Sequence, residues 1–559
     1  MSDQPAPAPT PSPWILSPGK DLLLFVATPV LILPVVLLLL QGIESRALQS
    51  YVLVFGASGH QLPGMIRAYG DRALFHRFRA RFIFAPLVVG GTCMMFYMQG
   101  AMVAILTIVL LWASWHALMQ VYGFLRIYDA KVGAVAPRIA RLDLAMVMVW
   151  FGGAMVLSDS RVYHIQELFI NFGIPPLTTG VLGVMRTTTA VVIGLVTLAY
   201  LATQVIPGPD GQRVNPVKHL LMFTAIGFWW FAHFVTKDVL LGLVMFEVFH
   251  DVQYLAIVWI FNRRRVDGDP AVGGFTRFLF RNSWGMMGLY LGLVLAYGGL
   301  IPVSIQFELG DQGIAVMEAL VATSALVHYY FDGFIWKIRE QSTRKALGVA
   351  DGSGAREKRV PWHAVKWLLF LVPCAVAWYV GEDKKVPALD KAQALVASTP
   401  DSARAQLQLG EALNISGRYL ESVVVLTRSL ELLPNDAKTE VELARAQLFA
   451  GRKLWHEKER DRAKDLLKKA YERIPEYAVH NSNEHGLRAF KEKRVEEAIE
   501  FLHMALFMQP DTLTVHINLA QIYRETDRIP LALKHAKRAA ALDPQNSEVA
   551  AMVRALEGR

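Results

Sequence analysis

Ionisable side chains interrupt an otherwise apolar stretch between Glu247 and Asn262, EVFHDVQYLAIVWIFN. Such groups are costly inside a membrane and usually face a helix-bundle interior or a polar cavity. Glu247 and His250 are three residues apart and share one face of a helix. With this spacing, bundle helices present a carboxylate and an imidazole to one metal ion. We therefore interpret the stretch, which also contains Asp251 and Gln253, as one wall of an intramembrane polar site.

Three other apolar stretches carry a histidine at a similar depth. With a rise of about 1.5 Å per residue, the four histidines lie roughly 18 to 23 Å from the outer ends of their predicted spans. We predict four metal ligands, namely His60, His116, His250 and His328. We predict that four further residues act beside them in catalysis, as ligands or by orienting ligands, namely Glu247, Asp332, Gln120 and Gln253.

Three more histidines in or beside apolar stretches do not fit this layer. By the same depth count, His233 lies within about 5 Å of the outer surface. His219 and His76 fall at the cytoplasmic edge of their spans. We therefore exclude these three from the predicted site.

Imidazole and carboxylate ligands suit iron or zinc. Iron with open positions would activate dioxygen against a lipid-borne hydrocarbon, and zinc with an open position would activate water. Single histidines dispersed over several spans resemble the arrangement in membrane carotene-cleaving oxygenases of the Brp/Blh type. This resemblance implies an oxidative reaction on a lipophilic substrate. The HxxxH and HxxHH boxes of membrane desaturases and hydroxylases are missing from the sequence.

Three alternatives remain open. In the first, His116 and His250 or another histidine pair are axial ligands of a haem b in an electron-transfer protein. In the second, the chain is a glycosyltransferase that uses lipid-linked sugars, although its first outer loop holds a single carboxylate, Glu44. In the third, the membrane part is a transporter or an assembly platform, and the histidines relay protons.

The bulk composition indicates a membrane protein. Of the 559 residues 53% are hydrophobic and 19% are charged, which is too apolar for an ordinary soluble chain. Taking about 20 apolar residues per crossing, we predict eleven helical spans. They lie near residues 21–42, 48–66, 82–99, 101–124, 143–158, 178–206, 219–236, 238–262, 284–305, 314–336 and 363–381.

Charge and cysteine content narrow the setting. The net charge of +9 comes largely from basic loops beside the spans, the pattern of cytoplasmic loops rather than of nucleic-acid binding. An odd number of spans then places the amino terminus in the cytoplasm of a bacterial-type inner membrane and the carboxyl-terminal domain outside. Cys93 and Cys374 both lie in apolar spans, so neither a disulfide framework nor a cysteine-based zinc site is expected.

The last third of the chain is soluble in composition and repeats itself. Its turn prolines, Pro400, Pro434, Pro475, Pro510 and Pro544, recur at intervals of 34, 41, 35 and 34 residues. The long interval is expected to hold an insertion around Trp455 to Arg460. Small residues precede the last four prolines at fixed offsets, namely Ser422 and Ser429, Ala463 and Ala470, Ala498 and Ala505, and Ala532 and Ala539.

Two glycines and a tyrosine complete this pattern. Gly410 and Gly486 stand where paired helices must approach closely, and Tyr523 fills a large position. Residues 396–559 thus resemble the tetratricopeptide repeat. This resemblance implies an α-solenoid that presents a concave face to a protein partner.

The predicted organisation is all-α with four parts. Residues 1–20, rich in proline, form a disordered tail; residues 21–381 form the membrane bundle; residues 382–395 form a linker; and residues 396–559 form the repeat domain.

Overall fold

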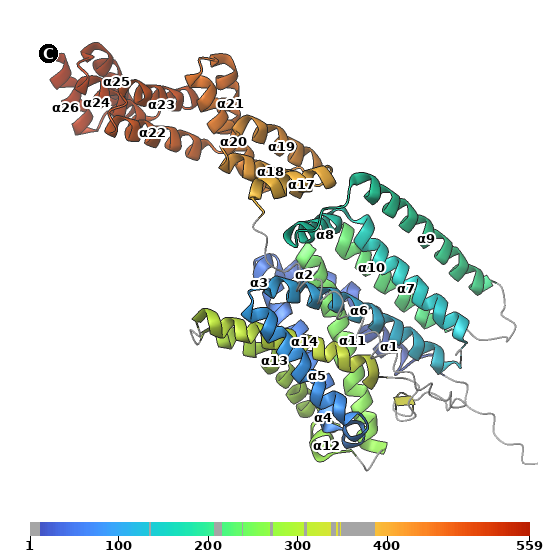
Figure 1. Ribbon diagram of the computed structural model, residues 1–559. Coiled ribbons are helices and arrows are strands. Elements are labelled where there is room, and N and C mark those ends of the chain that lie inside the picture. The colour runs from blue at the N-terminus through green and yellow to red at the C-terminus, as the bar shows by residue number, and fades with distance from the viewer. Residues whose placement is uncertain are drawn as a thin grey trace, which may run out of the picture. The chain divides into compact units, whose positions relative to one another are not determined.

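The computed structural model describes residues 12–133, 136–205, 215–236, 239–268, 272–306, 310–336, 343–344, 347 and 386–558. Throughout these residues the secondary structure is helical, without a strand (Figure 1). The chain divides into two compact units, Met1–Lys385 and Val386–Arg559. The all-α fold class predicted from the sequence is therefore confirmed.

The first unit is a bundle of long apolar helices joined by short ones. Its α-helices and π-helices (η) are α1 (Pro18–Asp21), η1 (Leu22–Val26), α2 (Thr28–Leu39), α3 (Ser45–Tyr51), η2 (Val52–Ser58), α4 (Gln61–Gly70), α5 (Arg72–Met98), α6 (Met102–Lys131), α7 (Pro137–Leu157), α8 (Asp159–Asn171), α9 (Thr179–Val205), α10 (Pro216–Phe234), α11 (Val239–Gly268), α12 (Gly274–Leu279), α13 (Trp284–Gln306) and α14 (Gly310–Ile335).

Among the described residues, six helices are long and apolar enough to cross a membrane, against eleven predicted spans. They lie in α5, α6, α7, α9, α11 and α14. A seventh is added if the pair around α2, Pro18–Val26 and Thr28–Leu39, which is bent by 54°, counts as one span. The eleventh predicted span, 363–381, lies outside the described residues.

The predicted span 48–66 is not one straight helix. It is divided into the end of α3, the π-helix η2 and the start of α4, with a break at Gly59 and His60. Close packing against α13 accompanies the break, because a Cβ on Gly298 of α13 would lie 2.2 Å from the carbonyl oxygen of Val54 in η2. Single π-helical turns inside helical segments are frequent at functional sites.

The helices of this unit differ strongly in burial. Leucines along α9, such as Leu195 and Leu198, are 62% and 65% exposed, and α9 lies at the edge of the unit in Figure 1. By contrast, 61% of the most apolar 18-residue segment of α11 is buried, and α11 packs against α2, α10 and η2. An exposed apolar helix surface suits contact with lipid, and a buried helix suits an interior wall. The stretch that begins at Glu247 is thus the central helix of the unit.

Residues 12–20 are part of the folded unit, although the sequence indicated a disordered tail over residues 1–20. Ile15 is 2% exposed, and its backbone N–H donates to Asp21 Oδ2 at 2.7 Å. The Asp21 carboxylate also accepts from the N–H of Leu16 and from the hydroxyl of Tyr128 on α6. This buried carboxylate satisfies the backbone of the segment and holds it against the bundle. Residues 1–11 lie outside the described part.

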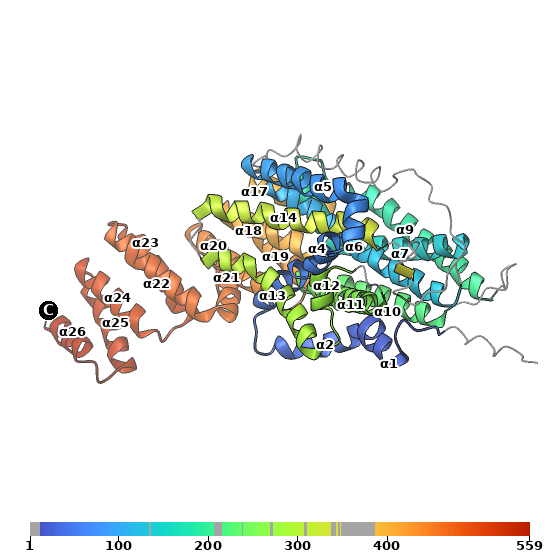
Figure 2. The ribbon, with the colours of Figure 1, turned by 90° about the horizontal axis from the view of Figure 1, so that it is seen from below.

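The second unit consists of successive helices packed as antiparallel hairpins; Figure 2 shows α22 beside α23 and α24 beside α25. Its helices are α17 (Ala388–Ser398), α18 (Ala403–Ile415), α19 (Tyr419–Leu432), α20 (Ala437–His456), α21 (Arg460–Arg473), α22 (Pro475–Lys491), α23 (Val495–Met508), α24 (Leu513–Glu525), α25 (Ile529–Leu542) and α26 (Ser547–Glu557). Helix α17 begins within the segment 382–395 that the sequence assigned to a linker. It packs on α18, and its Ala392 and Leu395 are fully buried.

The repeat geometry follows the period read from the sequence. The turn inside each hairpin contains one residue with a positive φ, namely Gly417, Lys458, Lys493 and Asp527, so these turns recur at 41, 35 and 34 residues. The long interval is absorbed by α20, which has 20 residues where α18 and α24 have 13. The extra residues therefore lengthen a helix and do not form an inserted loop around Trp455 to Arg460.

The small residues predicted to lie between paired helices are buried. Ser422, Ala463, Ala498 and Ala532 each have an exposed fraction of 0%. A Cβ on Gly410 would lie 2.4 Å from Leu426, and one on Gly486 would lie 2.9 Å from Leu502. Each hairpin thus needs a small residue at its helix crossing, as the sequence pattern indicated.

Candidate functional site

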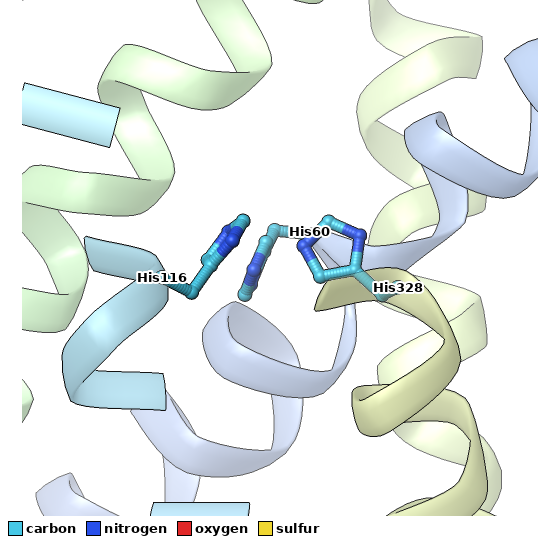
Figure 3. A group of neighbouring side chains, drawn as sticks. All are labelled: His60, His116 and His328. Atoms are coloured by element: carbon cyan, nitrogen blue, oxygen red, sulfur yellow. The ribbon is translucent and has the colours of Figure 1, made fainter. Parts of the chain in front are cut away.

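Four histidines from four different segments meet inside the first unit. His60 lies at the break between η2 and α4, and His116, His250 and His328 lie on α6, α11 and α14. The ring centroids of His60 and His328 are 4.9 Å apart, and His116 lies 4.9 Å from His328 and 5.0 Å from His250. Figure 3 shows the rings of His60, His116 and His328 gathered between their helices. The structure therefore brings together all four histidines that depth alone had selected.

These rings carry buried nitrogen atoms that lack hydrogen-bond partners within the described part of the chain. The atoms are His60 Nε2, His116 Nε2, His250 Nδ1 and both ring nitrogens of His328. His60, His250 and His328 are at most 3% exposed. A buried polar atom without a partner costs about 1–3 kcal/mol. Several such atoms lie close together here, so these rings could hold a shared ligand.

The Asp332 carboxylate lies beside two of these histidines. Its Oδ1 atom accepts hydrogen bonds from the hydroxyl of Tyr254 and the indole N–H of Trp336, each at 3.1 Å. Its Oδ2 atom lies 3.9 Å from His116 Nε2 and 3.8 Å from His328 Nε2. These distances are too long for hydrogen bonds. Two donors thus hold one carboxylate oxygen and leave the other directed at two imidazole nitrogens.

A second pair of carboxylates faces the other side of His60. His60 Nδ1 lies 2.9 Å from Asp251 Oδ1 and 3.8 Å from Glu247 Oε1. Both acids are on α11, one turn apart, so they share a face with His250. Asp251 belongs to the polar stretch read from the sequence, where no role was predicted for it. Its spacing of four residues from Glu247 could have indicated that the two carboxylates share one face of the helix.

Gln120 and Gln253 support the site through the backbone of α11. Gln120 Nε2 donates to the carbonyl oxygen of His250 at 2.9 Å and to Gln253 Oε1 at 3.2 Å. Gln253 Nε2 donates to the carbonyl oxygen of Phe25 at 2.7 Å. The two amides therefore fix the position of α11 and reach His250 through its main chain, not through its ring.

The ligand atoms of this region fall into two groups that share His60. One group is His60, His116 and His328, and the other is His60, Glu247, His250 and Asp251. Within each group, all the candidate ligand atoms lie within 4.8 Å of one another. Nitrogen and oxygen donors at this spacing fit a borderline cation such as iron or zinc.

The three histidines that the depth count excluded lie elsewhere. The Nδ1 atom of His233 lies 2.7 Å from the carbonyl oxygen of Trp229, one turn earlier on α10. His219 contacts Tyr200, and His76 contacts the ring of Phe75. The Nε2 atoms of His219 and His233 are also buried without a hydrogen-bond partner in the described part of the chain, but neither residue belongs to a group of candidate ligands there.

A second buried polar cluster was not predicted from the sequence. Lys218 Nζ of α10 lies 2.9 Å from Asp129 Oδ2 of α6 and 3.1 Å from Asp143 Oδ2 of α7. Arg126 pairs with both carboxylates, so two cations balance two anions. All three members of the lysine–aspartate group are at most 1% exposed. Basic residues near the ends of the spans were interpreted as cytoplasmic loop charges, so this network was not predicted.

Comparisons with known proteins inform the second unit. A comparison with curated proteins gave no match. The model of the tetratricopeptide repeat family matches residues 489–556, which cover α23, α24 and α25 and most of α26. The carboxyl-terminal unit therefore contains tetratricopeptide repeats, as its period and its small residues had indicated.

Proposed function

We propose that the first unit is a membrane-embedded, metal-dependent enzyme that oxidises a lipophilic substrate, and that the repeat unit binds a protein partner. One observation carries the first half of this proposal. Ring nitrogens of His60, His116 and His328 converge within 4.8 Å of one another, with Asp332 Oδ2 beside two of them. This donor set fits iron, which when bound would supply the activation of dioxygen.

Around such an ion, the residues of the chain would have separate roles. His60, His116 and His328 would bind it through their ring nitrogens. Asp332 would add an oxygen ligand whose position Tyr254 and Trp336 fix. Asp251 would accept the Nδ1–H of His60 and so orient the ring, as outer carboxylates do for metal-bound histidines.

A lipophilic substrate fits the setting of the site. The unit consists of apolar helices, and the aromatic rings of Tyr254 and Tyr329 lie close to the histidines, at 5.6 Å from His60 and 4.9 Å from His116. Cleavage of a carbon–carbon double bond balances with dioxygen alone, because each of its two oxygen atoms ends in one carbonyl group. Hydroxylation of a C–H bond would also require two electrons and two protons from a separate donor. We therefore place double-bond cleavage first.

Crowding makes a haem b less suitable. A porphyrin between two axial imidazoles needs an open plane on the line that joins them. Here His60 lies 5.1 Å from His250 and 6.4 Å from His116, and His328 lies 4.9 Å from His116. The additional imidazoles occupy the space that the ring would need. An absorption spectrum of the purified protein with a Soret band would favour haem.

The proposal also includes the side of the membrane on which the repeat unit lies. An odd number of spans in a bacterial inner membrane would place the amino terminus in the cytoplasm and the repeats outside. Tetratricopeptide solenoids present a concave face to peptides or proteins, so an extracytoplasmic protein partner is expected there. Protease protection in vesicles of known orientation tests the side of the repeats.

Metal content tests the enzyme proposal directly. The full chain, purified in detergent without added chelator, should contain iron, and His116→Ala and His328→Ala should each remove the ion that the group of His60, His116 and His328 binds. His233→Ala is the matched control, because this buried histidine lies outside the group and should leave the metal content unchanged. Folded wild-type protein without transition metal, even after incubation with iron(II) or zinc, would refute the proposal; zinc alone would redirect it to hydrolysis.

A further inference from the structure

We infer that the centre holds two metal ions, the second bound by Glu247, His250 and Asp251 of α11. This inference rests on the proposed function, because it adds an ion to the site described there. The structure assigns His116, His328 and Asp332 to the first ion and the α11 residues to the second. His60 lies between the two.

The first argument is the grouping of the ligand atoms. His250 does not fall in the group of His60, His116 and His328, although its ring lies 5.0 Å from that of His116. It falls instead with Glu247 and Asp251, within 4.8 Å of both. Its Nδ1 atom is buried and lacks a hydrogen-bond partner among the described residues. A single ion at the first group would leave this nitrogen without a partner.

The second argument is charge. Glu247 and Asp251 lie one turn apart on α11, with side chains 22% and 8% exposed. Both carboxylates face the imidazole of His60. Two carboxylates in a low-dielectric interior repel each other and lose hydration, so they need a strong positive charge nearby. A divalent cation between them supplies it, and Glu247-x-x-His250 is a spacing that carboxylate-bridged metal sites use in helix bundles.

The third argument is the double role that His60 has. Its Nδ1 atom faces Asp251 at 2.9 Å, and its Nε2 atom has no hydrogen-bond partner in the part of the chain that the structure describes. With Nε2 on the first ion and Nδ1–H donating to a carboxylate on the second, one ring links both ions. Two ions that share a ligand network can act on both atoms of a bound dioxygen or on both ends of a polarised bond.

Metal stoichiometry of the full chain tests this inference. Apoprotein in detergent is titrated anaerobically with iron(II), and in a parallel arm with zinc, and the bound metal is measured after gel filtration. We expect saturation at two ions for the wild type and for His233→Ala. The Glu247→Gln, His250→Ala double variant should retain one ion, and the His116→Ala, His328→Ala double variant should retain the other.

The outcomes separate the two proposals. A wild type that saturates at one ion overturns the second site and leaves the proposed function standing, whereas a wild type that binds none overturns both. Loss of both ions from either double variant, in protein that elutes as the wild type does, also argues against separable sites. If a variant does not fold, a further measurement on the wild type still tests the inference. Protein loaded with manganese(II) should give the electron paramagnetic resonance spectrum of a coupled pair, and the spectrum of isolated ions would overturn the inference.

Discussion

The Nδ1 atom of His60 lies 2.9 Å from Asp251 Oδ1, across an interface between two segments that are far apart in the chain. The same Nδ1 atom lies 3.2 Å from the carbonyl oxygen of Gly56, its hydrogen-bond partner. The two contacts hold the Nδ1 side of the ring and leave Nε2 without a hydrogen-bond partner among the described residues. Gly56 makes the approach possible, since a Cβ on that residue would lie 2.5 Å from Asp251 Oδ2.

Replacing the Asp251 carboxylate should weaken the binding of the ion that His60, His116 and His328 hold. We expect Asp251→Asn to lower the affinity for this ion by about 10–100-fold, the usual effect of losing an outer carboxylate of a metal-bound histidine. Competition with a chromophoric chelator measures it. Asp267→Asn, an exposed aspartate on the same helix that pairs with Arg263, is the control and should bind metal as the wild type does. Equal affinities in the two variants would remove Asp251 from the site.

The space beside His328 depends on Gly64 of α4. A Cβ there would lie 2.9 Å from the Tyr254 hydroxyl, 3.1 Å from His328 Nδ1 and 3.2 Å from Asp332 Oδ1. Gly64→Ala should displace these groups at a cost of about 1–3 kcal/mol, the usual range for overpacking. Metal affinity should then fall by about one to two orders of magnitude.

A matched glycine provides the control for this experiment. Gly123 lies on α6, and a Cβ there meets no atom within 4 Å. Gly123→Ala should therefore keep full metal affinity and gain up to about 1 kcal/mol of helix stability. If both alanine variants bind metal equally well, the close approach at Gly64 has no bearing on the ion.

The four histidines could be selected from the sequence because the depth of a residue in the membrane is estimated for each apolar segment by itself. Counting residues from the ends of apolar spans selected His60, His116, His250 and His328, and the excluded His233 indeed lies elsewhere. The partners of these residues could not be predicted in the same way. Tyr254 reaches Asp332 only because of the rotation and crossing of α11 and α14, which no single segment encodes. Trp336 is four residues after Asp332, so that contact is local.

The repeats were the most predictable part, since their period repeats one local rule several times. The irregular parts of the bundle were harder to read. The segment 48–66 is apolar throughout like a straight span, but packing against α13 accompanies its division into α3, η2 and α4. Likewise, Lys218 follows a polar loop in the sequence and is buried only because Asp129 and Asp143 neutralise it.

The network around Lys218 should contribute strongly to stability. Lys218→Met would leave the carboxylates of Asp129 and Asp143 paired with Arg126. Removing one partner of a buried ion pair costs about 3–5 kcal/mol. A thermal-stability scan of the full chain in detergent should show a clear loss. The exposed Lys20 provides the control, and Lys20→Met should melt within error of the wild type.

The repeat unit contains a buried histidine pair that should make its last hairpin sensitive to acid. His516 Nε2 lies 2.9 Å from the carbonyl oxygen of Pro510, to which it must donate. In the neutral ring, His516 Nδ1 is then an acceptor, so His535 Nδ1, at 2.9 Å, is the donor. His503 and Tyr523 also pack against the His535 ring.

Burial, with the nearby charges of His516, His503 and Lys534, lowers the pKa of His535 from 6.5 to about 4. The unfolded chain therefore takes up this proton first as the pH falls. Stability of the hairpin α24–α25 should be constant with respect to this group above pH 6.5 and should decline between about pH 6.5 and pH 4. Hydrogen exchange of α24 and α25 in the full chain, corrected for the intrinsic pH dependence of exchange, measures this. His535→Gln keeps a side-chain N–H for His516 but cannot titrate, so the decline should flatten, while peptides from α18 and α19 serve as the internal reference. A decline that is equally steep in His535→Gln would assign the acid sensitivity to another group.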